Sequence, residues 1–315
     1  MSKFLNFKEV SEIMIDERKA RNIDNICKYG IQILDEYLWG ILENELVVIW
    51  AGSWVWKTEL AWQVAITNAM RWKKVALLSL EWDVGEISYR YFQREINKKR
   101  KKDFLWWPEY RLNLTNVEKE EQKVLKEIPK ELIENLKIFD KSFIPDREKL
   151  LRLLEEECDN VDMFVIDHLH YLDYGADERN GITEIVRWIK EMTEIIKVPV
   201  VLISHLRRDF DKNWKLPTKS DLHWSSNIEK NANTVILIAS NTENEELIEF
   251  DNPWQSAYLR WTRLVVDKNR TWMPVPAIFD ATFDIRTKEY LVWPKHQYIS
   301  PDEKNKITSF DKIFT

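Results

Sequence analysis

A lysine followed by a threonine stands between an apolar run and an amphipathic stretch in the first fifth of the chain. The apolar run is 47–49, and the pair is Lys57 and Thr58. A strand–loop–helix unit with Lys-Thr at the loop's end is typical of a phosphate-binding loop, where backbone amides hold phosphate oxygens. We expect Lys57 to pair with nucleotide β- and γ-phosphate oxygens and the Thr58 hydroxyl to bind Mg²⁺. The alternative is an ordinary helix N-terminus.

The loop between them has the length of a Walker A loop but carries tryptophan where such loops carry glycine. Glycine lets the backbone amides approach the phosphates closely, so Trp54 and Trp56 are unexpected. We expect the indole at position 56 to project into the space that the β-phosphate needs. The predicted nucleotide-binding residues are Ala51, Gly52, Ser53, Trp54, Val55, Trp56, Lys57, Thr58 and Asp167.

The whole chain is poor in glycine and rich in tryptophan. It has 6 glycines and 16 tryptophans in 315 residues, and together they make about 7% of the chain, the usual share of glycine alone. Trp39 and Trp72 each precede a predicted strand, where a turn or a helix C-terminus favours glycine. We hypothesise that codons UGA, read as glycine in some bacterial lineages, were translated as tryptophan. The alternative is that these are true tryptophans in core or interface positions.

Polar side chains end three further apolar runs. Asp167 ends "MFVID", Glu81 ends "VALLSLE" and His205 ends "VVLISH". An aspartate at the carboxyl end of a strand beside the phosphate-binding loop would bind Mg²⁺ together with Thr58. Glu81 would orient the attacking water, and His205 would sense the γ-phosphate. The alternatives are a strand cap, a solvated turn carboxylate and a structural histidine.

The apolar runs alternate with amphipathic stretches, which indicates an α/β fold. Continuous Val/Ile/Leu runs predict a mainly parallel sheet with helices on both faces. The predicted strands lie within 45–50, 74–81, 163–172, 198–206, 234–240 and 262–269, and the predicted helices within 58–71, 84–100, 146–158 and 181–197. The charge-dense region 98–137 predicts solvated helices.

Composition restricts the protein class. The net charge of −6 gives no overall basic character, so any contact with nucleic acid must be local. Cys27 and Cys158 have no metal-ligand spacing and imply no disulfide framework. No run approaches the roughly 18 apolar residues of a membrane span, so we expect a cytoplasmic protein without membrane contact. The expected organisation is an N-terminal helical extension at 1–27, an ATPase domain at 28–295 and a polar tail at 296–315.

With these residues in place, the chain from about 28 to 293 resembles the ATPase domain of the DnaB-like hexameric replicative helicases, and within them the phage helicase-primase branch. The resemblance implies a RecA-like P-loop NTPase fold. It rests on "GIQILDEYLWG", "LSLEWD", "VIDHLHYL", "VPVVLISHLRRDFDKNWKLPTKSDLHWSSNIEKNANTVILI" and "VVDKNRTWMP", which follow one another in the family's order. The departures are Trp56, Trp224 and Trp272 where the family has glycine, and His223 where it has arginine.

The resemblance also implies roles for particular residues. Glu81 would be the catalytic base, His205 the phage-like variant of a glutamine, and Lys57 the phosphate-loop lysine. Lys268 and Arg270 would reach the nucleotide of a neighbouring subunit. Basic side chains on loops that face the channel of the ring would contact DNA phosphates, although each of them is as well explained as an ordinary solvated charge. They are Arg179, Arg207, Arg208, Lys212 and Lys215.

The expected function is that of an ATP-dependent DNA helicase core, which hydrolyses ATP with Mg²⁺ and moves along single-stranded DNA as a homo-hexameric ring during replication. A separate primase or loader is a further candidate partner. The alternatives are a RecA- or KaiC-like ATPase in recombination or regulation, and a pseudo-ATPase that binds no nucleotide if the tryptophans are genuine.

Overall fold

A computed structural model describes residues 6–20, 26–51, 56–100, 104–144, 146–169, 172, 178–205, 230–240, 259–271 and 273–292. The strands are β1 (Leu46–Ala51), β2 (Val75–Ser79), β3 (Leu136–Asp140), β4 (Met163–Asp167), β5 (Val200–His205), β6 (Thr234–Ser240), β7 (Leu259–Asn269), β8 (Ala277–Asp284) and β9 (Glu289–Val292). The helices are α1 (Phe7–Ala20), α2 (Gln32–Leu38), α3 (Lys57–Ala69), α4 (Val84–Arg100), α5 (Trp107–Arg111), α6 (Glu118–Lys126), α7 (Lys130–Asn135), α8 (Arg147–Glu157) and α9 (Glu178–Ile196).

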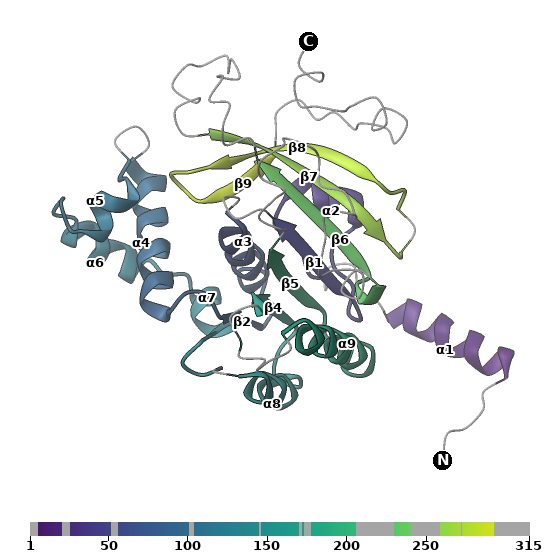
Figure 1. Ribbon diagram of the computed structural model, residues 1–315. Coiled ribbons are helices and arrows are strands. Elements are labelled where there is room, and N and C mark those ends of the chain that lie inside the picture. Colours follow the sequence, from purple (N-terminus) through teal and green to yellow (C-terminus); the bar gives the residue numbers. More distant parts are fainter. Residues whose placement is uncertain are drawn as a thin grey trace, which may run out of the picture.

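All these strands join one sheet in the order β3-β2-β4-β5-β1-β6-β7-β8-β9 (Figure 1). The strands from β3 to β6 run parallel, and β7, β8 and β9 continue the sheet antiparallel. The prediction of a mainly parallel sheet is therefore confirmed, and each of the six predicted strands is present. The prediction missed β3, β8 and β9. β3 lies at the end of a charge-dense region, and the sequence of β8, "AIFDATFD", has aspartate and threonine between its apolar residues.

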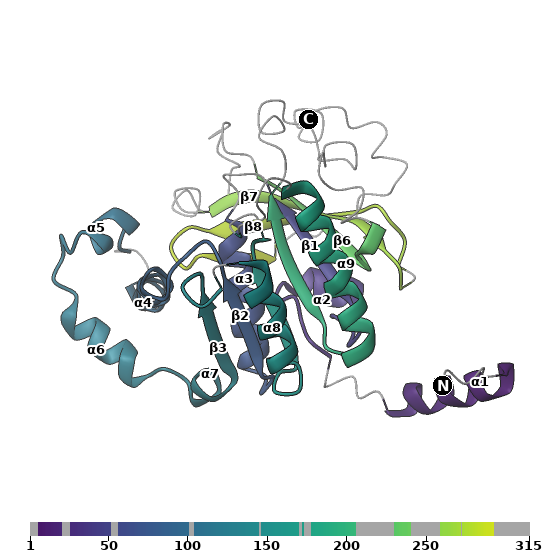
Figure 2. The same cartoon turned by 60° about the horizontal axis from the view of Figure 1, so that its bottom comes forward.

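Helices cover both faces of the sheet, as predicted. Side chains of a strand alternate between the two faces, so a strand buried on both faces packs with helices on each side. In β1, Val47 and Ile49 pack with α2 and α3, whereas Val48 and Trp50 pack with α8 and α9. Figure 2 shows α8 and α9 lying over their face of the sheet. Trp50, at the end of the predicted strand 45–50, is a fully buried residue of β1, and the strand continues to Ala51, which the sequence predicted as the first residue of the phosphate-binding loop.

The region 98–137 is more than a set of solvated helices. α4, α5 and α6 project together from one end of the sheet (Figure 1) and enclose a small apolar core of their own. Buried Ile96, Leu105, Tyr110, Val117 and Val124 form that core. We call α4–α6 the helical subdomain. The prediction missed this core because the few apolar residues are spread thinly among many charges.

At the other end of the molecule, α1 lies apart from the sheet in both views (Figures 1 and 2), and Phe7, Val10, Ile13 and Met14 are exposed. The predicted tail at 296–315 lies outside the described residues. Among the helices in the described part of the chain, none combines the length and the apolarity needed to cross a bilayer.

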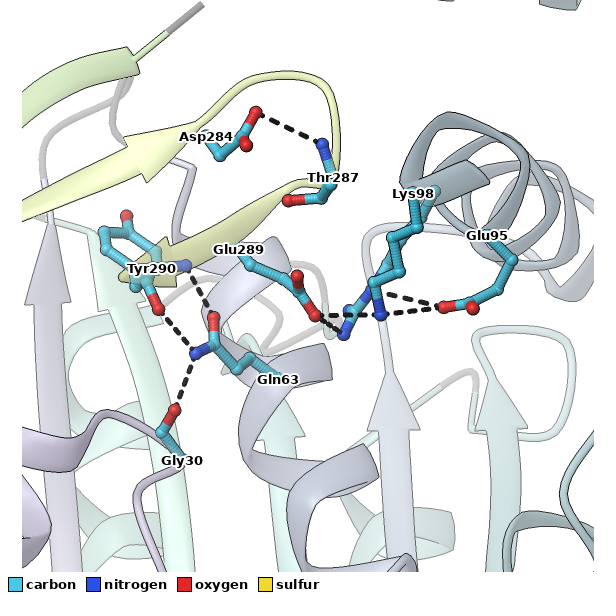
Figure 3. Close-up of polar contacts among 9 residues, drawn as sticks. Gly30, Gln63, Glu95, Lys98, Asp284, Thr287, Glu289 and Tyr290 are labelled. Carbon is cyan, nitrogen blue, oxygen red and sulfur yellow. Dashed lines mark hydrogen bonds and ion pairs between the residues drawn. The ribbon is translucent and has the colours of Figure 1, made fainter. Parts of the chain in front are cut away.

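The middle of α3 is fixed to two distant segments through Gln63. Its Nε2 donates to the carbonyl oxygens of Gly30 (2.6 Å) and Tyr290 (2.9 Å), and its Oε1 accepts from the Tyr290 amide (2.7 Å), as Figure 3 shows. Gly30 has φ +73° and lies so close to Thr67 that a Cβ would clash. The buried amide of Gln63 therefore ties β9 and the chain before α2 to the same helix.

Two of the tryptophans have backbone conformations that favour glycine. Trp39 follows α2 with φ 64° and ψ 10°, and Trp72 follows α3 with φ 64°. The Trp72 amide donates to the Ala69 carbonyl (3.0 Å) and the Lys73 amide to the Asn68 carbonyl (3.1 Å), which is the Schellman pattern. Trp72 is thus the C′ residue of α3, the position predicted from the sequence. Both indoles are more than half exposed, so packing offsets little of the backbone strain.

We therefore expect Trp72→Gly to stabilise the protein, because a side chain in the left-handed region costs about 1–2 kcal/mol. Denaturant unfolding should show a gain of about 1 kcal/mol, reduced by the greater freedom of glycine in the unfolded chain. Trp62→Gly is the matched control: Trp62 is buried within α3, and its removal should cost at least about 3 kcal/mol. A loss of stability in Trp72→Gly would contradict the glycine interpretation at this position.

Candidate nucleotide-binding site

The carboxyl ends of four parallel strands lie at one edge of the sheet, where α3 begins. Ala51 at the end of β1 pairs with His205 of β5, and Ser79 of β2 pairs with Asp167 of β4. The sequence predicted that the strand ending in Asp167 lies beside the phosphate-binding loop. In the structure β5 lies between that strand, β4, and β1. Ligands of open α/β sheets bind at such an edge. Residues 52–55 of the loop lie outside the described part.

Predicted residues from three elements meet at this edge. The Lys57 Nζ lies 3.9 Å from the Glu81 Oε2, and the Thr58 hydroxyl donates to the same oxygen at 3.4 Å. The Leu80 amide donates to the Asp167 carbonyl at 2.6 Å. Glu81 is the next residue after Leu80, so its backbone lies close to the end of β4. Lys57, Thr58 and Asp167 are buried, and Glu81 is partly exposed. The structure thus brings four of the predicted site residues together.

In the described part of the chain, neither oxygen of the buried Asp167 carboxylate has a well-formed hydrogen bond, although the nearby Thr58 hydroxyl lowers its pKa. Burial raises the pKa of this carboxyl from 3.8 to about 6, against the opposing effect of nearby polar and cationic groups. A buried carboxylate that lacks partners is suited to a cation, and the Thr58 hydroxyl is near it. The described residues contain no cluster of three or more carboxylate, histidine or cysteine side chains that would hold a metal ion alone. One carboxylate and one hydroxyl fit Mg²⁺, which takes its other ligands from phosphate and water.

The ammonium group of Lys57 is held in the same low-dielectric region. Burial lowers its pKa, while the carboxylates of Glu81 and Asp167 act in the opposite direction and favour the charged form. The ammonium group and the two carboxylates sum to one negative charge, so a phosphate would need Mg²⁺ beside the carboxylates to offset its own charge. The Lys57 ammonium and the N-terminus of α3 both favour an anion at their own end of the site.

Sequence reasoning missed His168, which directly follows Asp167. Its Nε2 lies 3.3 Å from the Glu81 Oε2, and its side chain is almost fully buried. The prediction instead singled out His205, whose backbone ends β5 but whose side chain lies outside the described part. A histidine after the strand-end aspartate was the available signal, but its direction depends on the turn after β4.

The expected direction of the Trp56 indole is wrong. Its ring stacks on Phe283 of β8 with a centroid distance of 4.2 Å and an interplanar angle of 9°. Its φ of −52° is open to any L-residue. The indole packs sideways against the apolar core because offset aromatic stacking and burial favour that contact. The Trp56 indole therefore points toward Phe283 and the apolar core, and not into the space expected for the phosphate.

Lys268 and Arg270 are not part of the cluster. β7 runs antiparallel to β6, so Asn269 pairs with Thr234, and Thr234 pairs in turn with Val47 at the start of β1. The Arg270 amide donates to the Asn233 carbonyl at 3.0 Å, and its guanidinium donates to the Lys230 carbonyl. At about 3.3 Å per residue, Val47 lies about 13 Å along the strand from the loop edge. Both basic residues therefore lie at the opposite edge of the sheet.

The side chains of the predicted DNA contacts lie outside the described part of the chain. Arg179 belongs to the first turn of α9, but its side chain lies outside the described part. Arg207, Arg208, Lys212 and Lys215 lie in 206–229, outside the described residues, as do Trp224 and Trp272. Their roles stay predictions.

Curated proteins that this chain resembles are named as replicative helicases. The chain is 26% identical over 279 residues to a "Probable replicative DNA helicase" of Trieres chinensis, which covers 81% of the chain and 55% of that protein. It is 28% identical over 206 residues to a "Probable plasmid replicative DNA helicase" of Chlamydia trachomatis, which covers 63% of the chain and 43% of that protein. The chain thus spans about half the length of these curated relatives.

The fold also matches a solved structure titled "The Structure Of A DnaB-Like Replicative Helicase And Its Interactions With Primase". The TM-score is 0.70 at 21% identity, over 91% of this chain and 68% of the other. A KaiC-like protein of Pyrococcus horikoshii matches with a TM-score of 0.53 at 16% identity, over 85% of this chain and 98% of the other. Both likenesses support a RecA-like fold. Residues 27–277 match the model of the DnaB-like helicase C terminal domain, and the chain belongs to that family.

Proposed function

We propose that this chain is the ATP-hydrolysing motor domain of a replicative DNA helicase. The observation that carries the proposal is the meeting of Lys57, Thr58, Glu81 and Asp167 at the carboxyl edge of the parallel strands, beside the N-terminus of α3. Family membership and the names of the relatives support DNA unwinding as the use of that hydrolysis.

Each side chain would have a separate task in binding the nucleotide. The Lys57 ammonium would neutralise charge on the β- and γ-phosphates, and the amides of the first turn of α3 would donate to phosphate oxygens. Thr58 and Asp167 would hold Mg²⁺. When bound, Mg²⁺ would offset the negative charge that the phosphates bring.

Glu81 is positioned to accept a proton from the attacking water. Its carboxylate is partly exposed, so water can reach it, and it is held by contacts with Lys57, Thr58 and His168. His168, within hydrogen-bonding reach of Glu81, would orient that carboxylate. A general base in such a position contributes about 10²–10⁴-fold to a rate.

Lys268 and Arg270 would act on the nucleotide of a neighbouring copy. Their place at the far edge of the sheet prevents contact with the cluster of their own chain, so a catalytic role requires a ring in which one copy presents that edge to the next. A homo-hexamer on single-stranded DNA follows from the family resemblance. A KaiC-like regulatory ATPase is the rival, and strand displacement on a forked duplex would separate the two.

Hydrolysis should depend on Lys57 and Glu81 in different ways. We use a glycine variant with Trp54→Gly and Trp56→Gly, because the loop needs glycine amides near the phosphates. In it, Lys57→Ala should weaken ATP binding and lower hydrolysis by about 10²–10³-fold. Glu81→Gln should lower hydrolysis by a similar factor but leave the ATP dissociation constant within about threefold. Hydrolysis near the parent rate in Lys57→Ala would remove this cluster from the site.

Asp167→Asn should stabilise the ligand-free protein and remove the Mg²⁺ dependence of ATP binding. An unpartnered buried polar group costs about 1–3 kcal/mol, and a neutral amide avoids the burial of charge. Because the folded-state pKa of about 6 lies above the ordinary value of 3.8, the cost is full above pH 6 and vanishes below pH 4. Denaturant unfolding should therefore show a gain at pH 8 that shrinks as the pH falls through 6. A loss of stability at pH 8 would contradict the unpartnered carboxylate.

Arg270→Ala should lower hydrolysis while nucleotide binding by the isolated chain stays nearly intact. Mixing Arg270→Ala chains with Lys57→Ala chains, both in the glycine variant, should restore part of the activity, because some interfaces then pair an intact lysine with an intact arginine. Hydrolysis measured across mixing ratios gives the test. Additive rates without recovery at any ratio would rule out a shared site.

A further inference from the structure

Arg90 of α4 stands at a junction between the helical subdomain and the nucleotide site. Its Nη1 donates to the Glu59 Oε1 at 2.6 Å, and its Nε donates to the Glu86 Oε1 at 3.0 Å. Its guanidinium carbon lies 3.9 Å from the ring centroid of Trp82 and 4.5 Å from that of Trp107. The side chain is 18% exposed. One guanidinium thus joins four side chains that come from α3, the turn after β2, α4 and α5.

Glu59 connects this junction to the phosphate-binding helix. It directly follows Thr58 in the first turn of α3, and its side chain is 5% exposed. Lys288 lies in the turn between β8 and β9. Burial lowers its pKa most strongly, and because Glu59 and Arg90 lie near it, Glu59 raises that pKa and Arg90 lowers it. Since the Arg90–Glu59 contact is short and mostly buried, it is stronger than a surface ion pair.

The same arginine also fixes the turn that carries Glu81. α4 begins at Val84, only three residues after Glu81, so the position of α4 sets the path of the turn. The Ser79 hydroxyl donates to the Trp82 carbonyl at 2.9 Å, and the Asp83 carboxylate accepts from the Glu86 amide at 2.8 Å. The guanidinium over the Trp82 ring holds the side chain next to Glu81.

We propose that Arg90 is a positioning residue, which holds the Glu81 turn against the first turn of α3 and so couples the helical subdomain to ATP hydrolysis. The proposal rests on the proposed role of Glu81 as the base. The contacts of Arg90 with Glu59 and Glu86 involve no tryptophan, so the link between α4 and α3 holds whichever residue the gene encodes at positions 82 and 107.

A second set of contacts anchors α4 elsewhere and provides a control. Lys98 lies 3.1 Å from Glu289 of β9, as Figure 3 shows, and Arg94 forms an ion pair with the same carboxylate. The Asn97 Nδ2 donates to the Arg286 carbonyl at 3.0 Å. Arg94 is 8% exposed and lies one turn after Arg90, yet it forms ion pairs with Glu95 and Glu289, away from Glu59 and Glu81. Arg94→Gln therefore loosens α4 without touching the junction.

The test compares Arg90→Gln, Arg90→Lys and Arg94→Gln in the glycine variant, with thermal unfolding of each. Arg90→Gln should lower kcat at least tenfold and leave the ATP dissociation constant within about threefold. Arg90→Lys should recover part of kcat, because lysine keeps the charge toward Glu59 but loses the planar fork that reaches Glu86 as well. Arg94→Gln should leave kcat within about twofold of the parent value, even if it lowers the melting temperature as much as Arg90→Gln does.

Hydrogen exchange of the ligand-free protein gives a readout that needs no activity. Amides of 80–86 should exchange at least tenfold faster in Arg90→Gln than in Arg94→Gln, because only the first frees the turn. Equal exchange in the two variants, or an equal loss of kcat, would overturn the proposal and leave Arg90 an ordinary anchor of α4. If the parent hydrolyses no ATP while exchange at 80–86 still depends on Arg90, the proposed function fails and the positioning of the turn stands.

Discussion

Two opposite charges buried at one edge of the sheet are the constraint on which the rest of the structure depends. Lys57 and Asp167 are both removed from water, and among the described residues Lys57 has only a long ion pair of 3.9 Å with Glu81, while Asp167 has no well-formed hydrogen bond. Uncompensated buried charge costs several kcal/mol, so the apolar faces on both sides of the sheet must supply the stability that holds the charges in place. This is the arrangement expected of a site whose charge balance is completed by a charged ligand.

The helix that begins at Lys57 is held at two separate points, and this explains how the edge keeps its geometry. Gln63 fixes the middle of α3 to the Tyr290 backbone of β9, and Glu59 fixes its first turn to Arg90 of α4. Gln63 is buried and Arg90 partly buried, and each of the two has more than one partner. The antiparallel extension and the helical subdomain thus support the same helix from different directions.

Much of the candidate site followed from local sequence patterns. Glu81 and Asp167 were predicted because they end apolar runs and the carboxyl ends of parallel strands lie together, and Lys57 and Thr58 because they stand between a loop and a helix. Positions that favour glycine were predicted at Trp39 from a turn before a strand and at Trp72 from the end of a helix, and both have the left-handed backbone conformation. These are local properties, and local patterns record them.

What the sequence did not provide depends on tertiary packing. The contact of His168 with Glu81 depends on the turn after β4, and the stacking of Trp56 on Phe283 depends on a strand more than 200 residues later.

The central claim is a nucleotide site at the start of α3. The most direct measurement is an ATP titration by calorimetry, with the chain as its sequence stands and with the Trp54→Gly/Trp56→Gly chain. We expect the second to bind at least tenfold more tightly, with Mg²⁺ required. Equally tight binding by both would contradict the need for glycine, and binding by neither would contradict the site itself.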